Sequence, residues 1–145
     1  MENYLSLLHI ETVRIDHVAI AVISIDRTKH VYTLLGGIES TLETVVEQGV
    51  SVLPIDFAGT RIELLEPLSE ESPVGKFIKK RGEGLHHVAF QVSDIVKSIA
   101  ECVEKGMKPL DKTPRNGADG RLIAFLDPRT TGGVLIELTQ VVQEL

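Results

Sequence analysis

Apolar and polar residues alternate in two stretches of the chain that resemble each other. The segments "IDHVAIAVISID" at 15–26 and "LHHVAFQVSDIV" at 85–96 share the triplet His-Val-Ala and have the two-residue period of a strand. The two histidines of these triplets, His17 and His87, are 70 residues apart. Self-similarity at a fixed spacing indicates that one structural unit occurs twice.

A second pair of apolar stretches supports the same repeat. The segments "RIELLE" at 61–66 and "LIELTQ" at 135–140 share Ile-Glu-Leu, and Glu63 and Glu137 are 74 residues apart. Each half of the chain therefore begins with a strand that carries a histidine. It ends with a strand that carries a glutamate.

The first half predicts a strand, a helix and three further strands. After the first strand, Ser24 or Asp26 can cap a helix through "RTKHVYTLL", which the glycines at 36 and 37 end. Strand-like segments follow near 40–47 and 49–57, and the turn "FAGT" leads into "TRIELLE".

The second half predicts the same order of elements. Ser93 or Asp94 can cap the helix "IVKSIAECVEK", which Gly106 ends. Three strands are then expected in "MKPLD", "RLIAFLD" and "GVLIELTQV", separated by the loops "PRNGADG" and "PRTTGG".

The pattern predicts an α+β fold of two tandem β-α-β-β-β modules that form a mixed sheet. We expect one domain over residues 1–145, with a first module at 14–67 and a second at 84–142. The linker at 68–83 should contain a short helix from Val74 to Arg81.

Composition narrows the class of protein further. The chain has 145 residues, 43% of them hydrophobic, which is enough for a core of ordinary size. Its net charge of −6 argues against a nucleic-acid or anionic-membrane partner. A single cysteine, Cys102, excludes an intrachain disulfide. No signal-peptide pattern and no membrane-spanning apolar run is found, so we expect a cytoplasmic protein.

The adjacent histidines His86 and His87 cannot both serve one site, because neighbouring strand side chains point to opposite faces. By the repeat, His87 is the equivalent of His17, and His86 takes the place of Asp16. We therefore assign His87 to the site and His86 to the other face of the sheet.

The repeat brings together a set of residues suited to a metal ion. Two imidazoles and two carboxylates can bind a divalent transition metal and leave positions open for a substrate. A lone histidine on an apolar strand is usually a hydrogen-bonded core residue, and a strand glutamate usually faces solvent. Four such residues in matched positions favour the metal, although duplication could also preserve them for structural reasons alone. The predicted ligands are His17, Glu63, His87 and Glu137.

These residues occur within longer motifs: "IDHVAIAV", "IELLEP", "SPVGKFIKKRGEGLHHVAF", "PRNGADGRLIAFLDP" and "TTGGVLIELTQ". In this order they resemble the vicinal oxygen chelate (glyoxalase/bleomycin resistance/dioxygenase) superfamily and, within it, the methylmalonyl-CoA epimerase family. The resemblance implies a cupped sheet with the metal inside, commonly in a homodimer. Carried over residue by residue, it implies the same four ligands. We expect a divalent ion, Co²⁺ in first place, with Zn²⁺, Mn²⁺ and Ni²⁺ as alternatives.

The implied reaction is epimerisation of methylmalonyl-CoA by removal and return of its α-proton through a metal-stabilised enolate. The resemblance assigns Glu137 to proton transfer as well as to the metal. We expect Arg115, in a glycine-containing loop, and Gln91, on the face of His87, to bind the substrate. Some members carry a second acid/base glutamate where this chain has Val52, so the second proton carrier is open: Glu137 alone, a metal-bound water or another side chain.

Two alternatives to the epimerase remain. One is a glyoxalase-type lyase or isomerase that acts on a thiol adduct, because fold alone does not fix the substrate. The other is a non-enzymatic protein that binds small molecules on the same scaffold. A ring-cleaving dioxygenase is disfavoured, since two histidines and one carboxylate are usual there and Glu63 would be surplus. At "FLDP", the chain also has Asp127 where relatives often have histidine, so no role is transferred to that position.

Overall fold

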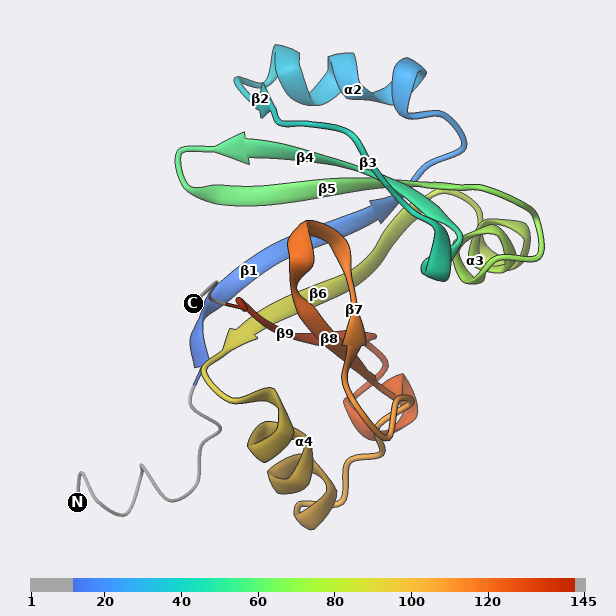
Figure 1. Cartoon of the computed structure of the whole chain (residues 1–145). Helices are drawn as coiled ribbons and strands as arrows, with labels where there is room; N and C mark the ends of the chain where they lie inside the picture. The colour runs from blue at the N-terminus through green and yellow to red at the C-terminus, as the bar shows by residue number, and fades with distance from the viewer. Residues whose placement is uncertain (1–11, 143–145) are drawn as a thin grey trace. The chain divides into compact units, whose positions relative to one another are not determined.

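The computed structural model describes residues 12–142, which form two compact units. We call residues 16–88 and 117–119 the first unit, and residues 12–15, 89–116 and 120–142 the second unit. Each unit is described by itself below, with the elements labelled as in Figure 1. The boundaries proposed from the sequence, 14–67 and 84–142, remain predictions.

The first unit contains a mixed sheet with the strand order β2-β4-β5-β1, and β3 also pairs with β4. Strand β1 runs parallel to β5, whereas β4 is antiparallel to β5. The strands are β1 (Thr12–Ala21), β2 (Ile38–Glu39), β3 (Glu43–Val45), β4 (Val50–Phe57) and β5 (Thr60–Pro67). The predicted mixed sheet is confirmed in this unit.

The turn predicted at "FAGT" joins β4 to β5. Ala58 and Gly59 both have positive φ, 53° and 94°, as a two-residue type I′ hairpin turn requires. The carboxylate of Asp56 accepts a hydrogen bond from the backbone N–H of Gly59 and supports the turn. This local chemistry sets the register of β4 against β5.

Two helices belong to the first unit, α2 (Ile25–Leu34) and α3 (Pro73–Arg81). As predicted, Ser24 caps α2 by accepting a hydrogen bond from the N–H of Arg27. Helix α3 fulfils the prediction of a linker helix, and Ser72 caps it with proline at its first position. A short 3-10 turn, η1 (Val46–Gln48), precedes β4.

The sheet of the first unit buries both of its faces. One face packs against α2 through a cluster around Ile55 and Leu64, with Tyr32 of the helix beside it. The opposite face, which carries Ala19 and Ala21, forms a second cluster with α3. The members of the second cluster are Ala19, Ala21, Val50, Val52, Leu65 and Val74, with Val45, Phe77 and Ile78 against them.

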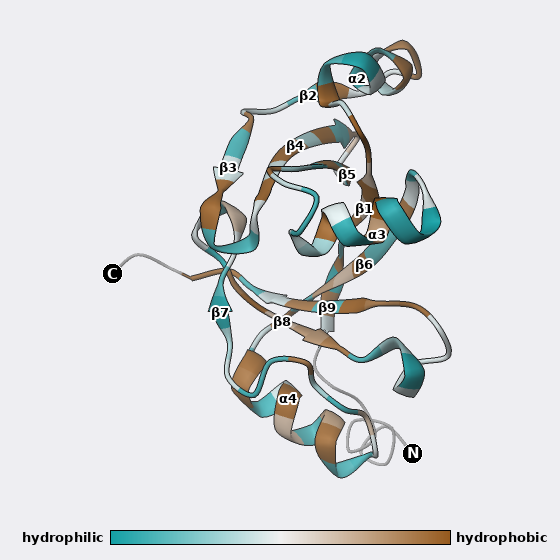
Figure 2. Ribbon diagram, turned by 90° about the vertical axis from the view of Figure 1, so that its right-hand side faces the viewer, coloured by the Kyte–Doolittle hydropathy of each residue, from teal (hydrophilic) through white to brown (hydrophobic). Residues whose placement is uncertain are grey.

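The second unit repeats this construction. Helix α4 (Ile95–Glu104) begins at the cap Asp94, and β9 pairs antiparallel with β8. The apolar stripe of helix α4, visible as brown bands in Figure 2, packs on a cluster that includes Val92, Ala124 and Leu138. The strands of this unit are β7 (Arg115–Asn116), β8 (Leu122–Leu126) and β9 (Ile136–Gln140), and its 3-10 turn is η3 (Pro128–Thr130). Strand β6 (Gly84–Val92) begins in the first unit and continues in the second from residue 89, and the 3-10 turn η2 (Ala118–Gly120) begins in the first unit and ends in the second.

A hydrogen bond at the start of each repeated helix shows the duplication at atomic level. In the first unit the N–H of Ile25 donates to Oε1 of Glu66 at 2.8 Å. In the second unit the N–H of Ile95 donates to Oε1 of Gln140, also at 2.8 Å. In both cases a side chain near the end of the last strand satisfies a helix N–H that has no partner within the helix. The β-α-β-β-β repeat is thereby confirmed.

The strand predicted over "MKPLD" is wrong. Pro109 makes only an isolated bridge to Leu126, and the strand that pairs with β8 is Arg115–Asn116, inside the predicted loop. Proline has no N–H to donate, so the ladder cannot extend through this position. Among the hydrogen bonds that hold the segment, one runs from Leu110 N–H to Phe125 O and another from Asp127 N–H to Lys108 O.

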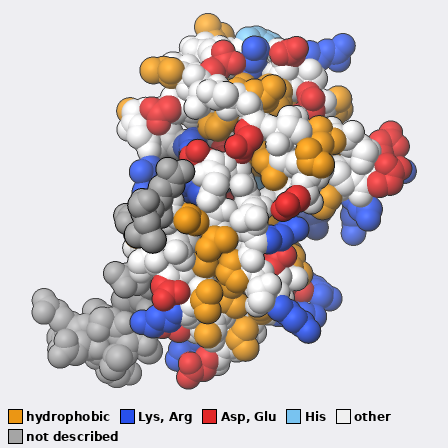
Figure 3. All heavy atoms as spheres, in the orientation of Figure 1, with side chains coloured by type: hydrophobic (Ala, Val, Ile, Leu, Met, Phe, Trp, Pro, Cys, Tyr) orange, Lys and Arg blue, Asp and Glu red, His pale blue; other side chains and the backbone are white. Residues whose placement is uncertain are grey.

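Within residues 12–142, no helix is long and apolar enough to cross a membrane. Figure 3 shows charged side chains of both signs interspersed on the face drawn. This mixture is consistent with the modest net charge of the sequence.

Candidate metal centre

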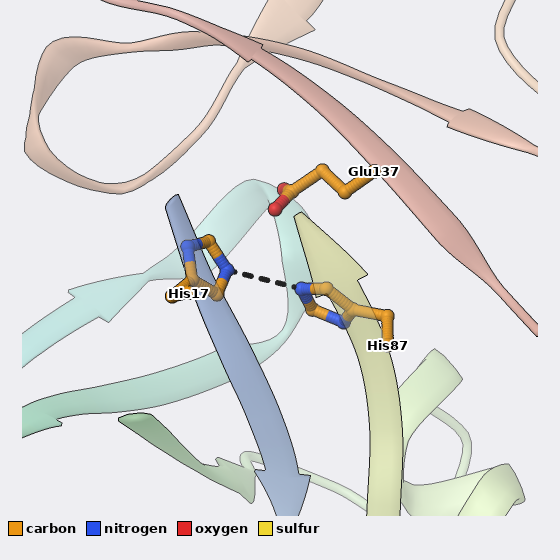
Figure 4. A group of neighbouring side chains, drawn as sticks. All are labelled: His17, His87 and Glu137. Atoms are coloured by element: carbon orange, nitrogen blue, oxygen red, sulfur yellow. Dashed lines mark hydrogen bonds between the residues drawn. The ribbon is translucent and has the colours of Figure 1, made fainter. Parts of the chain in front are cut away.

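Two buried histidines of the first unit face each other from β1 and β6. His17 and His87 are each 6% exposed, and their Nε2 atoms lie 3.2 Å apart, as the dashed line in Figure 4 shows. The ring planes meet at 73°, so the two rings meet edge to face rather than stacking. The structure therefore brings these two predicted site residues together.

The second nitrogen of each of these rings also has a partner. Nδ1 of His17 lies 2.6 Å from Oδ2 of Asp16, and Nδ1 of His87 lies 2.8 Å from Nδ1 of His86. In each strand the partner is the residue immediately before the histidine. Both Nε2 atoms are thus directed toward the same point, away from these partners.

The spacing of the two Nε2 atoms fits a shared metal ion. Two imidazole nitrogens at about 2.1 Å from one ion are about 3.0 Å apart at a right angle and about 3.4 Å apart at the tetrahedral angle. The observed 3.2 Å falls between these values. A carboxylate on Nδ1 is also the usual companion of a metal-binding histidine. The residues present therefore fit a divalent ion.

Glu63 lies on β5 beside the other side of the His17 ring. Its Oε2 is 2.8 Å from Nη2 of Arg61 and 3.4 Å from Nδ1 of His17. The same Arg61 nitrogen lies 3.1 Å from Oδ2 of Asp16. The structure thus groups Glu63 with Asp16 and Arg61, near Nδ1 of His17.

Strand alternation predicts that His86 points to the opposite face from His87, but the structure shows contacts that this prediction does not include. Its ring packs edge to face on Phe77 of α3, with the centroids 4.8 Å apart, while its Nδ1 reaches His87. Sequence reasoning missed His86, Asp16 and Arg61 as contributors to the site. The available signal was the pair of dipeptides Asp-His and His-His at equivalent positions of the repeat.

Beyond Arg61 and Glu63, the sheet face that carries His17 continues as an apolar cluster. Ala19 lies opposite Glu63 in the parallel register, and Ala21 lies opposite Leu65. Val52, where the sequence comparison leaves a second acid/base group open, is 4% exposed and lies opposite Leu65 on the same face. A valine side chain has no ionisable group, so this position supplies no proton carrier.

The second unit holds the other predicted site residues. Glu137, on β9, is 5% exposed and lies opposite Phe125 in the antiparallel register. Arg115 lies opposite Ile123 in the β7–β8 pair, and Ile123 lies opposite Thr139, so Arg115 shares a sheet face with Glu137. The Arg115 guanidinium is 6.0 Å from the Phe125 ring centroid.

Arg115 and Gln91, the two predicted substrate-binding residues, differ in their exposure to solvent. Nε of Arg115 lies 3.0 Å from Oδ1 of Asp111, and the side chain is 46% exposed, so part of its guanidinium faces solvent. Gln91 is half-buried on β6, two positions beyond Ala89 on the same face.

Two ionisable groups of the second unit have pKa values that are shifted by contacts away from the predicted site residues. Hydrogen bonds from the side chain and the backbone of Arg129 lower the pKa of Asp127 to about 2. Asp127 also caps the turn η3 by accepting a hydrogen bond from the N–H of Arg129. Burial, with a smaller contribution from Glu101, raises the pKa of the Cys102 thiol.

Comparison of the chain with models of known protein families identifies the class of protein to which this fold and this histidine pair belong. Residues 16–125 match the model of the Glyoxalase/Bleomycin resistance protein/Dioxygenase superfamily. The chain belongs to this superfamily, and the α+β fold expected from the sequence is confirmed.

Individual relatives narrow the comparison. The chain is 41% identical over 128 residues to the uncharacterized protein YqjC of Bacillus subtilis, covering 88% of this chain and 91% of that protein. It is 37% identical to the ethylmalonyl-CoA/methylmalonyl-CoA epimerase of Cereibacter sphaeroides, over 88% of this chain and 98% of that protein. A crystallised methylmalonyl-CoA epimerase from Mycobacterium tuberculosis superposes with a TM-score of 0.86 at 32% identity, covering 91% of this chain and 90% of that one. The resemblance to this enzyme family is confirmed, as is the expectation of an enzyme of the isomerase class.

Proposed function

We propose that this protein is a metal-dependent epimerase that acts on methylmalonyl-CoA. The observation that carries the proposal is the buried pair His17 and His87, whose Nε2 atoms face each other while both Nδ1 atoms are held. The likeness to enzymes named for this substrate supports the choice of reaction.

The proposed ligands are His17, His87, Glu137 and Glu63. The repeat supports Glu137, because it is the counterpart of Glu63 and is buried on the equivalent strand. Oε2 of Glu63 lies 2.8 Å from Nη2 of Arg61. Because a carboxylate has two oxygens, Glu63 can bind an ion and keep this contact. When bound, a divalent ion supplies Lewis-acid stabilisation of the negative charge that develops on the substrate oxygen, and Co²⁺ is our first choice.

Glu137 is the proposed proton carrier on one side of the substrate. Its carboxylate can accept the α-proton and return it, which is the task of a general base and acid. Because Val52 is apolar, the second proton must come from elsewhere. The nearest carboxylate by strand register is Glu43 of β3, which lies directly opposite Val52 and hence on the face of His17. We propose Glu43 as the second carrier.

The proposed substrate-binding surface is the face of the second unit that carries Glu137. Arg115 presents a partly exposed guanidinium there, and a guanidinium suits the carboxylate or phosphate groups of an acyl-CoA. Gln91 can donate or accept a hydrogen bond but cannot carry a proton. We also propose that the protein assembles as a homodimer.

Deuterium incorporation tests the proposal directly. Metal-loaded protein incubated with methylmalonyl-CoA in deuterated water should place deuterium at the α-carbon, and a chelator should abolish the exchange. Glu137→Gln should lower exchange at least about 100-fold, the usual scale of losing a general base. No exchange, with turnover of a glutathione hemithioacetal instead, would establish the glyoxalase-type alternative.

The two epimers separate the two proposed carriers. Glu43→Gln should slow exchange from one epimer far more than from the other. Glu39→Gln is the matched control, because Glu39 lies opposite Ile55 on the α2 face and pairs with Lys29 at 3.5 Å. Equal rates for both epimers in Glu43→Gln would show that Glu43 carries no proton.

A further inference from the structure

The partners of the two Nδ1 atoms differ chemically although their positions in the repeat are equivalent. Asp16 precedes His17 and offers a carboxylate, whereas His86 precedes His87 and offers a second imidazole. Asp16 is 4% exposed, and both contacts lie inside the first unit. We propose that Asp16 and His86 are positioning residues that set which nitrogen of each ligand histidine is free to bind the metal. The inference rests on the proposed metal centre.

Asp16 can fix the tautomer of His17 without help. An ionised carboxylate only accepts hydrogen bonds, so the contact at 2.6 Å requires His17 to donate from Nδ1. A neutral ring with hydrogen on Nδ1 has a bare Nε2, which is the form that binds a metal. Arg61 holds the same Asp16 oxygen at 3.1 Å and keeps the carboxylate in place.

His86 cannot fix His87 in the same way, because an imidazole nitrogen either donates or accepts. The 2.8 Å contact between Nδ1 of His86 and Nδ1 of His87 fits donation in either direction. For Nε2 of His87 to bind the ion, its hydrogen must lie on Nδ1, and His86 must then accept that hydrogen bond on its own Nδ1.

His86 therefore supports metal binding by His87 only in the tautomer that carries hydrogen on Nε2. The packing of His86 on Phe77 keeps the ring in place. In the first half of the site the carboxylate of Asp16 fixes the tautomer of the ligand, whereas in the second half that tautomer depends on the tautomer of His86.

Zinc affinity is the first test, with Zn²⁺ as the probe in competition with a chelator. Asp16→Ala should weaken binding about 10- to 100-fold, the usual cost of losing such a partner. His86→Phe keeps a ring against Phe77 but removes the nitrogen, and it should weaken binding on the same scale. His86→Asp copies the first half of the repeat and should bind Zn²⁺ at least as tightly as the unmodified chain.

Matched controls come from the same unit. Asp56→Asn changes a carboxylate that supports the β4–β5 turn, and His30→Phe changes a histidine of α2. Both should keep the unmodified affinity for Zn²⁺. Folded Asp16→Ala and His86→Phe proteins with unchanged affinity would overturn the inference.

Nitrogen chemical shifts of the imidazoles give a second test that needs no variant. In the Zn²⁺-loaded protein, His17 and His87 should carry hydrogen on Nδ1 only, and His86 should carry hydrogen on Nε2 only. Hydrogen on Nδ1 of His86 in the Zn²⁺-loaded protein would contradict the inference. An unmodified chain that binds no Zn²⁺ would instead refute the proposed metal centre, and absent deuterium exchange in a zinc-binding chain would refute only the proposed reaction.

Discussion

Thr139 offers a stability prediction that is independent of any metal or substrate. Its side chain is fully buried on β9, opposite Ile123, and its hydroxyl has no hydrogen-bond partner among the described residues. A buried hydroxyl without a partner costs about 1–3 kcal/mol of desolvation. Thr139→Val has nearly the same shape and removes that cost, so we expect it to stabilise the protein by this amount.

The expected change is large enough to measure by thermal unfolding. At about 2.1 cal/mol/K per residue, a chain of 145 residues has an unfolding entropy of about 0.3 kcal/mol/K. The predicted rise in Tm is therefore about 3–10 °C. The matched control is Thr130→Val, because the Thr130 hydroxyl donates to Asp127 O at 2.8 Å and accepts from Lys108 N at 3.1 Å. The control should lower Tm. An unchanged or lower Tm for Thr139→Val would show that the hydroxyl is satisfied and the reasoning wrong.

Three further predictions concern groups whose surroundings are equally well defined. The pKa of Asp127 is about 2 in the folded protein, below its ordinary 3.8, so the contribution of Asp127 to stability is present above about pH 4 and is lost toward pH 2. Arg129→Ala should flatten the pH dependence of the unfolding free energy in that range; an unaltered profile would contradict it. Cys102 should react with iodoacetamide far more slowly in the native protein than in denaturant, because burial raises its pKa, and equal rates would argue against this. Gly75→Ala should lower Tm by several degrees, since an added Cβ would clash with the backbone oxygen of Ser69, and calorimetry that finds no loss would refute the clash.

Most of the secondary structure could be predicted because its causes are local. The caps Ser24 and Asp94, the turn at "FAGT" and the two-residue period of the strands act over a few residues, and all of them occur in the structure. The repeat added the correspondence between His17 and His87, which a single strand could not supply. The exception was "MKPLD", where an apolar pattern suggested a strand and Pro109 prevented one.

The sequence by itself determined which histidines face each other, and tertiary structure decided how each ring is used. Strand alternation separates His86 from His87, but packing on α3 brings the two Nδ1 atoms to 2.8 Å. Likewise, the parallel register that sets Arg61 opposite His17 allows Arg61 to hold Asp16. Hydrogen-bond partners of this kind depend on the register between strands that are distant in sequence, and no local pattern encodes that register.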